Sequence, residues 1–256
     1  MIRVAVIPAR YGSTRFPGKA LAVIQGRPMV AWVVRAALAA RRLDHVLVAT
    51  DDERIAEAAR DAGAEAVLTT GNHATGTDRV AEAIRDRPAD VVLNLQGDVP
   101  LLEPSDVDRL AGAFDDESVA LATLGVRGAT AEELANPRAA KIVVDDLGNA
   151  LYFSRAAIPY RHVQGGVPAL AANERDPDAW IHVGTYGFRR EVLERLVREP
   201  RQGLEAVEDL EQLRALRLGF RMRVVEVAAT PIGVDVPEDV AQVETILRSR
   251  SEGVPR

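Results

Sequence analysis

Three cationic side chains lie in one short loop after the first apolar run of the chain. That run, residues 4–9, has strand character, and Arg10, Arg15 and Lys19 follow it with two glycines between them. No acidic residue precedes Asp44, whereas eight basic residues do. Glycines let backbone N–H groups approach phosphate, and guanidinium and ammonium groups neutralise it. The loop therefore predicts a site for a polyanion such as a nucleoside triphosphate.

The same loop has a simpler interpretation, because clusters of charge are common on solvated turns. The choice of cation adds information: only Lys19 and Lys141 are lysines among 32 basic residues. Such a bias reflects base composition, and two lysines retained against it suggest that a compact ammonium matters at both positions. Chance retention is the alternative.

An acidic residue is predicted to lie beside this loop. Asp98 follows residues 90–96, an apolar run that predicts a buried strand, and ligands of open α/β sheets bind beyond the carboxyl ends of strands. Mg²⁺ sites combine one or two carboxylates with phosphate oxygens and waters, so Asp98 is a candidate Mg²⁺ ligand. An aspartate in a turn near a proline is the alternative. Asp235 precedes the last predicted helix, where a carboxylate can stabilise the helix start.

Several familiar sites are absent from the sequence. The loop is not a Walker A loop, because Ala20 follows Gly18-Lys19 and Gly12 lies one residue too far back. No G-x-G-x-x-G follows the first strand, which argues against a dinucleotide cofactor, and no G-x-S-x-G is present, which argues against an α/β-hydrolase. The residues by themselves indicate a phosphate- or nucleotide-binding protein with one or two acidic metal ligands.

Composition narrows the class further. The chain has 256 residues and a net charge of −6, which argues against nucleic acid as a partner. It has no cysteine, which excludes disulfides, thiolate metal sites and a cysteine nucleophile and fits the cytoplasm. No apolar run reaches membrane-spanning length, and the first residues carry no signal-peptide pattern. We therefore expect a cytoplasmic protein with no membrane partner.

Alternating strands and helices must position these groups. The continuous apolar strands predict an α/β fold with a mostly parallel sheet covered by helices on both faces. Strands are expected at residues 4–8, 21–24, 45–50, 65–68, 90–96, 118–127, 141–144, 150–155, 180–189 and 222–227, and helices at 28–40, 52–62, 77–87, 104–115, 204–218 and 237–248.

Local signals add detail to this pattern. Asp51 or Asp52 is predicted to cap the second helix, and Thr77 or Asp78 the third. Residues 161–178 predict a protruding loop. In the helix expected at 204–218, an apolar face formed by Leu204, Val207, Leu210, Leu213 and Leu216 is opposed by a solvated acidic face.

Two polar aromatic residues share a face of one strand. His182 and Tyr186 are four residues apart within the strand expected at 180–189, so the period of two places them on the same side. Taken alone, each is interpreted as an ordinary half-buried polar side chain.

Along nearly its whole length the chain resembles the 3-deoxy-manno-octulosonate (Kdo) cytidylyltransferases, also called CMP-Kdo synthetases. The stretches that carry the resemblance are residues 7–19 (IPARYGSTRFPGK), 73–79 (HATGTDR), 96–98 (QGD), 151–159 (LYFSRAAIP), 182–187 (HVGTYG), 210–214 (LEQLR) and 233–235 (GVD). Each is short, and together, in this order, they are specific. The family transfers CMP from CTP to Kdo and releases pyrophosphate.

The resemblance implies a nucleotidyltransferase-type, Rossmann-like mixed sheet in a single domain over residues 1–256, with a small protruding hairpin region at about 135–190 for sugar binding and dimerisation. It also implies site residues. The nucleotide would contact Pro8, Ala9, Arg10, Arg15, Lys19, Thr77, Arg79 and Gln96. Asp98 and Asp235 would ligate Mg²⁺ and, with Arg10 and Lys19, form the catalytic set. Kdo would contact Arg155, His182, Tyr186, Glu211 and Gln212. A homodimer and a product used for lipopolysaccharide or capsule are also implied.

One position departs from the family pattern. Many relatives have Glu where this chain has Val99, and a valine can neither ligate a metal nor accept a hydrogen bond. If the glutamate of the relatives contributes to the surroundings of a second metal ion, this chain binds metal differently. Asp98 is retained, so the expected activity stands.

Two other functions stay open at this point. One is cytidylyl transfer to another acidic sugar, such as amino-substituted Kdo or a sialic acid. The other is a non-catalytic nucleotide-binding regulator, against which the pair Asp98 and Asp235 argues, since binding alone needs no metal pair.

Overall fold

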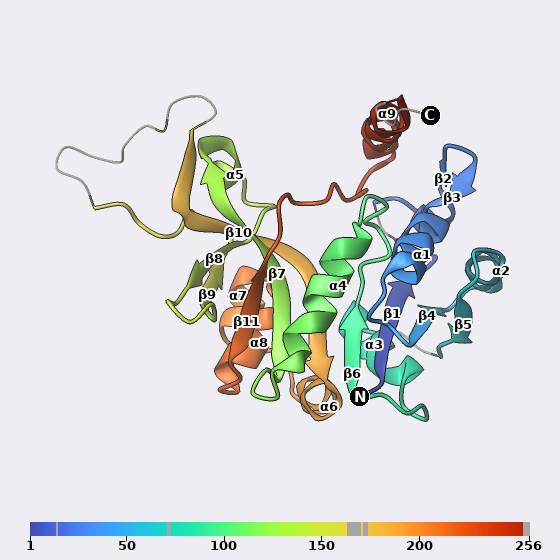
Figure 1. Ribbon diagram of the computed structural model, residues 1–256, viewed down its shortest axis with the longest axis horizontal. Helices are drawn as coiled ribbons and strands as arrows, with labels where there is room; N and C mark the ends of the chain where they lie inside the picture. The colour runs from blue at the N-terminus through green and yellow to red at the C-terminus, as the bar shows by residue number, and fades with distance from the viewer. Residues whose placement is uncertain (14, 71–72, 163–169, 171–173, 253–256) are drawn as a thin grey trace. The chain divides into compact units, whose positions relative to one another are not determined.

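The structure, a computed structural model, describes residues 1–13, 15–70, 73–162, 170 and 174–252 (Figure 1). The chain divides into two compact units. The first unit is Met1–Ala111 with Pro231–Arg256, and the second unit is Gly112–Thr230. The sequence predicts a single domain with an excursion at about 135–190, and that excursion lies within the second unit.

The first unit is built on a parallel sheet in the order β6-β1-β4-β5. Its strands are β1 (Arg3–Ala9), β4 (His45–Thr50), β5 (Glu65–Leu68) and β6 (Val91–Asn94). The middle strands are apolar on both faces and almost wholly buried, as expected for a parallel sheet covered on both sides. All four strands were predicted from such continuous apolar runs.

Helices connect these strands in doubly wound order. They are α1 (Met29–Ala39), α2 (Glu53–Asp61) and α3 (Gly76–Ala83), and the unit is completed by α4 (Pro104–Gly112) and α9 (Pro237–Glu252). Because crossovers between parallel strands are right-handed, α1 and α2 cover one face of the sheet and α3 the other. Residues 21–24, predicted as one strand, are divided between a 3₁₀ turn (Lys19–Leu21) and β2 (Val23–Ile24), which pairs with β3 (Arg27–Pro28).

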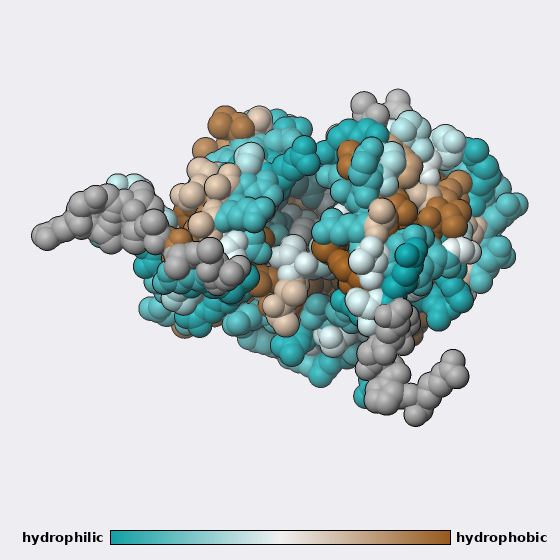
Figure 2. Space-filling view, turned by 90° about the horizontal axis from the view of Figure 1, so that it is seen from above, coloured by the Kyte–Doolittle hydropathy of each residue, from teal (hydrophilic) through white to brown (hydrophobic). Residues whose placement is uncertain are grey.

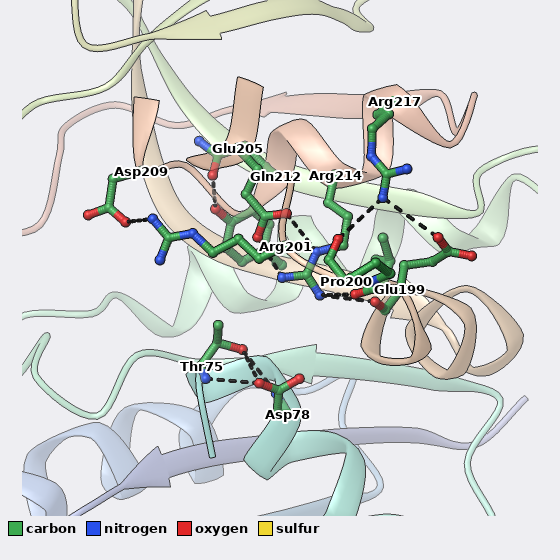
Figure 3. Close-up of polar contacts among 12 residues, drawn as sticks. Thr75, Asp78, Glu199, Pro200, Arg201, Glu205, Asp209, Gln212, Arg214 and Arg217 are labelled. Atoms are coloured by element: carbon green, nitrogen blue, oxygen red, sulfur yellow. Dashed lines mark hydrogen bonds and ion pairs between the residues drawn. The ribbon is translucent and has the colours of Figure 1, made fainter. Parts of the chain in front are cut away.

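One helix start differs from the prediction. Asp52 caps α2, as one of the two predicted alternatives. However, α3 is capped by Thr75, not by Thr77 or Asp78, and it ends at Ala83. The Thr75 hydroxyl accepts the N–H of Asp78 (3.2 Å), and the Asp78 carboxylate accepts the N–H of Thr75 (2.9 Å), which is a reciprocal capping box (Figure 3).

The second unit is centred on β7 (Leu121–Thr130). This strand is antiparallel to β10 (Arg175–Arg189) and parallel to β11 (Met222–Glu226), and the hairpin of β8 (Lys141–Val144) and β9 (Ala150–Ser154) pairs with β10. The unit's helices are the 3₁₀ turn Ala113–Asp115, α5 (Ala131–Ala135), α6 (Arg190–Arg198), α7 (Leu204–Glu208) and α8 (Gln212–Arg217). The predicted mixed, mostly parallel sheet with helices is confirmed.

Three features of the second unit were missed. Neither α5 nor α6 was predicted. The strand β10 begins at Arg175, five residues before its predicted start, so the loop expected at 161–178 is shorter at its second end. The interior of that loop, residues 163–169 and 171–173, lies outside the described residues.

The helix expected at 204–218 is two short helices. Asp209 has a φ of 52° and ends α7, and α8 begins at Gln212. Because of the break, residues of α7 and α8 do not share the continuous apolar face that one helix would have. Leu204 and Val207, predicted to be buried, are 55% and 81% exposed.

The same break explains a second error. Glu205, assigned to a solvated acidic face, is 3% exposed and forms an ion pair with the equally buried Arg214 at 2.5 Å (Figure 3). Arg214 also donates to the backbone carbonyls of Leu196 and Glu199. The pair therefore connects α6, α7 and α8 inside the second unit.

The surface is mixed in polarity. Hydrophilic residues predominate on the face drawn in Figure 2, and hydrophobic residues form separate patches on it. Among the described residues, every helix is too short or too polar to cross a bilayer.

Candidate active site

A polar pocket of about 410 Å³ lies in the first unit, where β1 and β6 end. Of the ten residues predicted to bind nucleotide or metal, all but one line it: Pro8, Ala9, Arg10, Arg15, Lys19, Arg79, Gln96, Asp98 and Asp235. The exception is Thr77. Its side chain is buried and accepts a hydrogen bond from the Asn94 amide at 3.1 Å.

The sheet order explains the position of the pocket. β1 and β6 are adjacent, but the connections run to opposite sides from this point, so the loops after the two strands diverge and leave a crevice. The two loops approach closely at Gly97, where an added Cβ would lie 2.8 Å from the carbonyl oxygen of Pro8. Only glycine permits that approach, which brings Asp98 beside the basic loop.

One ammonium group bridges the two predicted metal ligands. Lys19 Nζ lies 2.6 Å from a carboxylate oxygen of Asp98 and 3.6 Å from one of Asp235. Arg15 reaches the same Asp235 oxygen at 3.2 Å. Residues from three distant parts of the chain thus converge, and the two carboxylates are near enough to share one cation.

The backbone holds Asp235 in this position. The N–H of Val234 donates to the carbonyl of Asp98 at 2.8 Å, so the segment before α9 lies directly against the turn after β6. Asp239 accepts the N–H groups of Asp235 and Val236 at 2.7 and 3.0 Å. The helix-start function considered for Asp235 therefore belongs to Asp239, and the Asp235 carboxylate contacts the cations of the pocket instead.

The carboxylate pair fits a divalent cation only together with other ligands. Among the described residues, no three acidic or histidine side chains gather closely enough to hold a metal. Two carboxylates that already share the Lys19 charge match the protein's part of a Mg²⁺ site, which phosphate oxygens and waters complete. Val99 is half-buried and does not line the pocket.

The opposite wall of the pocket comes from the start of α3. Arg79 is 5% exposed, and its guanidinium donates to the Thr69 hydroxyl and to Asp51. His73, which was not predicted as a site residue, also lines the pocket. Its Nε2 lies 2.6 Å from Glu82, whose pKa is lowered chiefly by the N–H of Thr70, with the Thr70 hydroxyl and His73 contributing. Its position at the start of the 73–79 motif is the signal from which His73 could have been predicted.

Three of the predicted sugar-binding residues form one chain of hydrogen bonds in the second unit. The Tyr186 hydroxyl donates to the Gln212 carbonyl oxygen at 3.0 Å, and the Gln212 amide lies 3.4 Å from His182 Nδ1. His182 Nε2 lies 2.9 Å from the Thr123 hydroxyl, which in turn lies 2.9 Å from the carbonyl oxygen of Thr185. The expectation that His182 and Tyr186 share a face is confirmed, since their ring centroids are 5.4 Å apart.

The chain of hydrogen bonds determines which nitrogen of the His182 imidazole carries the proton. The single hydroxyl proton of Thr123 goes to the Thr185 carbonyl, so His182 donates from Nε2 and accepts at Nδ1 from the Gln212 amide. Burial lowers the pKa of His182 to about 3. It also raises the pKa of Tyr186, with a smaller contribution from the charge of Glu211. Both side chains are therefore neutral hydrogen-bonding groups at neutral pH.

Arg155 is less available than the sequence predicts. Its Nε donates to the carbonyl of Glu208 (2.7 Å) and its Nη2 to that of Asp209 (3.0 Å). Its Nη1 donates to the carbonyl of Pro137 at 3.1 Å. Three of the five guanidinium N–H groups thus hold the backbone, and the Asp209 carboxylate lies 3.9 Å from Nη2, so two N–H groups have no hydrogen bond among the described residues.

The second lysine has a structural function. Lys141 is fully buried, and its ammonium donates to three backbone carbonyls, those of Asn136, Ala139 and Arg155, at 2.7 to 2.8 Å. Burial lowers its pKa, and the nearby Arg155 adds to this effect. A compact group with three donors is what this cage requires, which explains why arginine does not replace it.

Comparisons with known proteins identify the family. Residues 4–224 match the family described as cytidylyltransferase. The chain belongs to the cytidylyltransferase family. A 3-deoxy-manno-octulosonate cytidylyltransferase of Myxococcus xanthus is 47% identical over 96% of this chain and 97% of its own length. One from an Anaeromyxobacter species is 50% identical over 96% of this chain and 98% of its own.

A solved structure extends the match to three dimensions. The structure of CMP:2-keto-3-deoxy-manno-octonic acid synthetase complexed with CTP aligns with a TM-score of 0.88 at 41% identity, over 98% of this chain and all of the other. The resemblance to the Kdo cytidylyltransferases is thereby confirmed, and this cytidylyltransferase is a nucleotidyltransferase enzyme. Its pocket therefore lies in the fold that its relatives use for nucleotide chemistry.

Proposed function

We propose that this enzyme transfers CMP from CTP to the 2-hydroxyl of 3-deoxy-D-manno-octulosonate, giving CMP-Kdo and pyrophosphate. The observation that carries the proposal is the convergence of Lys19, Asp98 and Asp235 in a basic pocket, in a chain nearly half identical to Kdo cytidylyltransferases. The product would supply the synthesis of lipopolysaccharide or capsule.

The nucleotide is assigned to the pocket of the first unit. Arg10, Arg15 and Lys19 would neutralise the triphosphate, with Pro8 and Ala9 forming the floor beneath it. Arg79 and Gln96 would contact the cytosine end, and the buried Thr77 would support them from the start of α3. Cations are needed here because each phosphate oxygen that loses water must regain a donor.

Asp98 and Asp235 would hold Mg²⁺ together with phosphate oxygens. When bound, the ion polarises the α-phosphate and lowers the pKa of a coordinated hydroxyl. Lys19 now occupies the place of positive charge between the carboxylates. We infer that Lys19 turns to the phosphates when the nucleotide and its ion arrive.

The sugar acid is assigned to the second unit. Neutral His182 and Tyr186 would contact a polyol with their rings, because their polar atoms already bond Thr123 and Gln212. Arg155 offers its two remaining N–H groups to the sugar carboxylate, with Glu211 nearby to accept from sugar hydroxyls. These groups are preorganised, so little ordering is needed when the substrate binds.

The proposed reaction joins the two substrates by one bond exchange at the α-phosphorus. The oxygen of the 2-hydroxyl forms a bond to the α-phosphorus, the bond from that phosphorus to the bridging oxygen breaks, and pyrophosphate leaves. The hydroxyl proton is lost to solvent. Arg10 and Lys19 would stabilise charge on the phosphate oxygens, since phosphoryl transfer is accelerated mainly by positioning and charge neutralisation.

We further propose that the enzyme is a homodimer in the cytoplasm. Three apolar side chains of the second unit are exposed: Leu151 (60%) on β9, and Leu204 (55%) and Val207 (81%) on α7. The side chain of Glu208 at the end of α7 bonds Ser154 of β9, so the two elements lie together. A second copy of the chain would cover these groups, and Val207→Glu should shift the sedimenting species from dimer toward monomer.

Pyrophosphate release from CTP and Mg²⁺ tests the function. The acceptors are Kdo, amino-substituted Kdo, a sialic acid and none, with the Asp98→Ala variant as the blank. The proposal expects release with Kdo. Release with only another acid would establish the alternative cytidylyltransferase, and no release with any acid would leave a nucleotide-binding regulator.

A further inference from the structure

Asp51 directly follows β4 and has an assignment that the sequence did not suggest. Its neighbour Asp52 caps α2 by accepting the N–H of Arg54. The Asp51 carboxylate is therefore not used by that helix. One of its oxygens accepts the backbone N–H of Tyr11 at 3.1 Å, and the other accepts from Arg79 Nη2 at 3.0 Å.

The two partners of Asp51 belong to different walls of the pocket. Tyr11 is the residue after Arg10, in the basic loop that follows β1. Arg79 is on α3, and its Nη1 is held by the Thr69 hydroxyl, so the guanidinium is fixed from two sides. Both Arg10 and Arg79 line the pocket, whereas Asp51 does not.

We propose that Asp51 is a positioning residue of the nucleotide site: it connects the basic loop to Arg79 and so fixes the spacing between the phosphate-binding and base-binding walls. The inference rests on the proposed function, which assigns these walls to the triphosphate and the cytosine. An aspartate has a short side chain with two rotatable bonds, so its two contacts leave little freedom to either wall.

Loss of charge alone and loss of positioning predict opposite changes in CTP binding when Asp51 is neutralised. A carboxylate near a bound triphosphate repels it, so an effect of charge alone predicts tighter CTP binding when Asp51 loses its charge. Positioning predicts weaker binding, because the loop and Arg79 lose their connection. The Asp51 side chain is 37% exposed, but that of its partner Arg79 is only 6% exposed, so losing the pair should lower the melting temperature by a few degrees without preventing folding.

The test compares Asp51→Asn with Asp44→Asn. Asparagine keeps the shape of the side chain and an acceptor for Tyr11, and it removes the acceptor for Arg79. Asp44 is the matched control, since it accepts the N–H of Arg3 at 2.7 Å at the opposite end of β4. Steady-state kinetics with CTP and UTP give KM and kcat, and thermal unfolding gives stability.

The expected result for Asp51→Asn is a rise of roughly tenfold in KM for CTP, with a smaller change in kcat and a lower preference for CTP over UTP. Its melting temperature should fall by only a few degrees, so that the variant is fully folded at the assay temperature. Asp44→Asn should keep the wild-type KM and preference. Thr69→Val, which removes the other contact of Arg79, should lower the preference in the same direction.

Three results would overturn the inference: a wild-type KM and preference in Asp51→Asn, a lower KM for CTP, or losses that disappear at assay temperatures where the variant is fully folded. Should Asp51→Asn fail to fold, Thr69→Val alone decides, and an unchanged preference would refute the inference. Absence of turnover in wild type would instead refute the proposed function, so the two failures are distinguishable.

Discussion

The two units use polar side chains in opposite ways. In the pocket of the first unit, three of the charged side chains are partly open: those of Asp98, Asp235 and Arg15 are 34%, 45% and 63% exposed, whereas Arg79 is buried. In the second unit, His182 is half-buried and bonded at both ring nitrogens, and the Glu205–Arg214 pair is almost fully buried.

This difference predicts which substitutions reduce activity and which reduce stability. Partly exposed charges contribute little to folding, so they can exchange partners when a polyanion binds. Buried polar groups must keep their partners, because an unpaired buried charge or amide is costly. We therefore expect substitutions in the pocket to reduce turnover, and substitutions in the buried network to reduce stability first.

The largest expected effect is on stability. Arg214→Met leaves the carboxylate of Glu205 buried without its partner, and it should lower the free energy of unfolding by about 3–5 kcal/mol. Chemical denaturation measures this loss. KM for CTP should stay unchanged in the folded fraction, since the pair lies outside the pocket.

A second variant is the control for that prediction. Adding Glu205→Gln to Arg214→Met removes the unpaired charge and should restore part of the lost stability. If the free energy of unfolding of the single Arg214→Met variant lies within about 1 kcal/mol of wild type, which is the value of an exposed pair, then the buried pair contributes no more to stability than an exposed one.

The next effect is on turnover. Asp98→Ala and Asp235→Ala should each reduce pyrophosphate release by about 100-fold or more, because the charge that would hold the metal is halved. Their unfolding free energies should change by only about 1 kcal/mol. Glu57→Ala, at an exposed carboxylate on α2, is the control and should retain wild-type rates. Wild-type turnover in either aspartate variant would refute the metal assignment.

A smaller effect concerns pH. His182 has a folded-state pKa of about 3 because of burial, and an unfolded-state value near 6.5. The unfolded chain thus binds the proton first as pH falls. The stability from neutral His182 is complete above about pH 6.5 and is lost toward pH 3, at up to about 1.4 kcal/mol per pH unit.

His182→Gln removes this titration. Unfolding free energies measured between pH 7 and pH 4 should fall less steeply in the variant than in wild type. Equal slopes in the variant and in wild type would show that His182 does not stay neutral in the folded protein over this pH range. The contrast between the two units would then lose its clearest example.

The strands and the basic loop could be predicted from the sequence because their signals are local. Continuous apolar runs identified β1, β4 and β6, and the basic loop stood out through the absence of acids around it. The capping box was also visible, since Thr75 and Asp78 have the required spacing, yet Thr77 was chosen as one of the nearer candidates.

Other features could not be predicted from local patterns. The contact between Asp98 and the segment before α9 depends on a backbone hydrogen bond between distant residues, and no periodicity reports it. The break at Asp209 depends on a positive φ that aspartate tolerates without a sequence signal as strong as glycine's. The contacts of Asp51 join three elements that only the folded sheet brings together.

A crystal structure with CTP and Mn²⁺ in place of Mg²⁺ tests the central claim most directly. Anomalous scattering would locate the ion without assumptions about its ligands. We predict one peak bonded to carboxylate oxygens of both Asp98 and Asp235 and to the phosphates, with Lys19 turned from the carboxylates toward the phosphates. An ion held away from either carboxylate, with Lys19 still between them, would contradict the account.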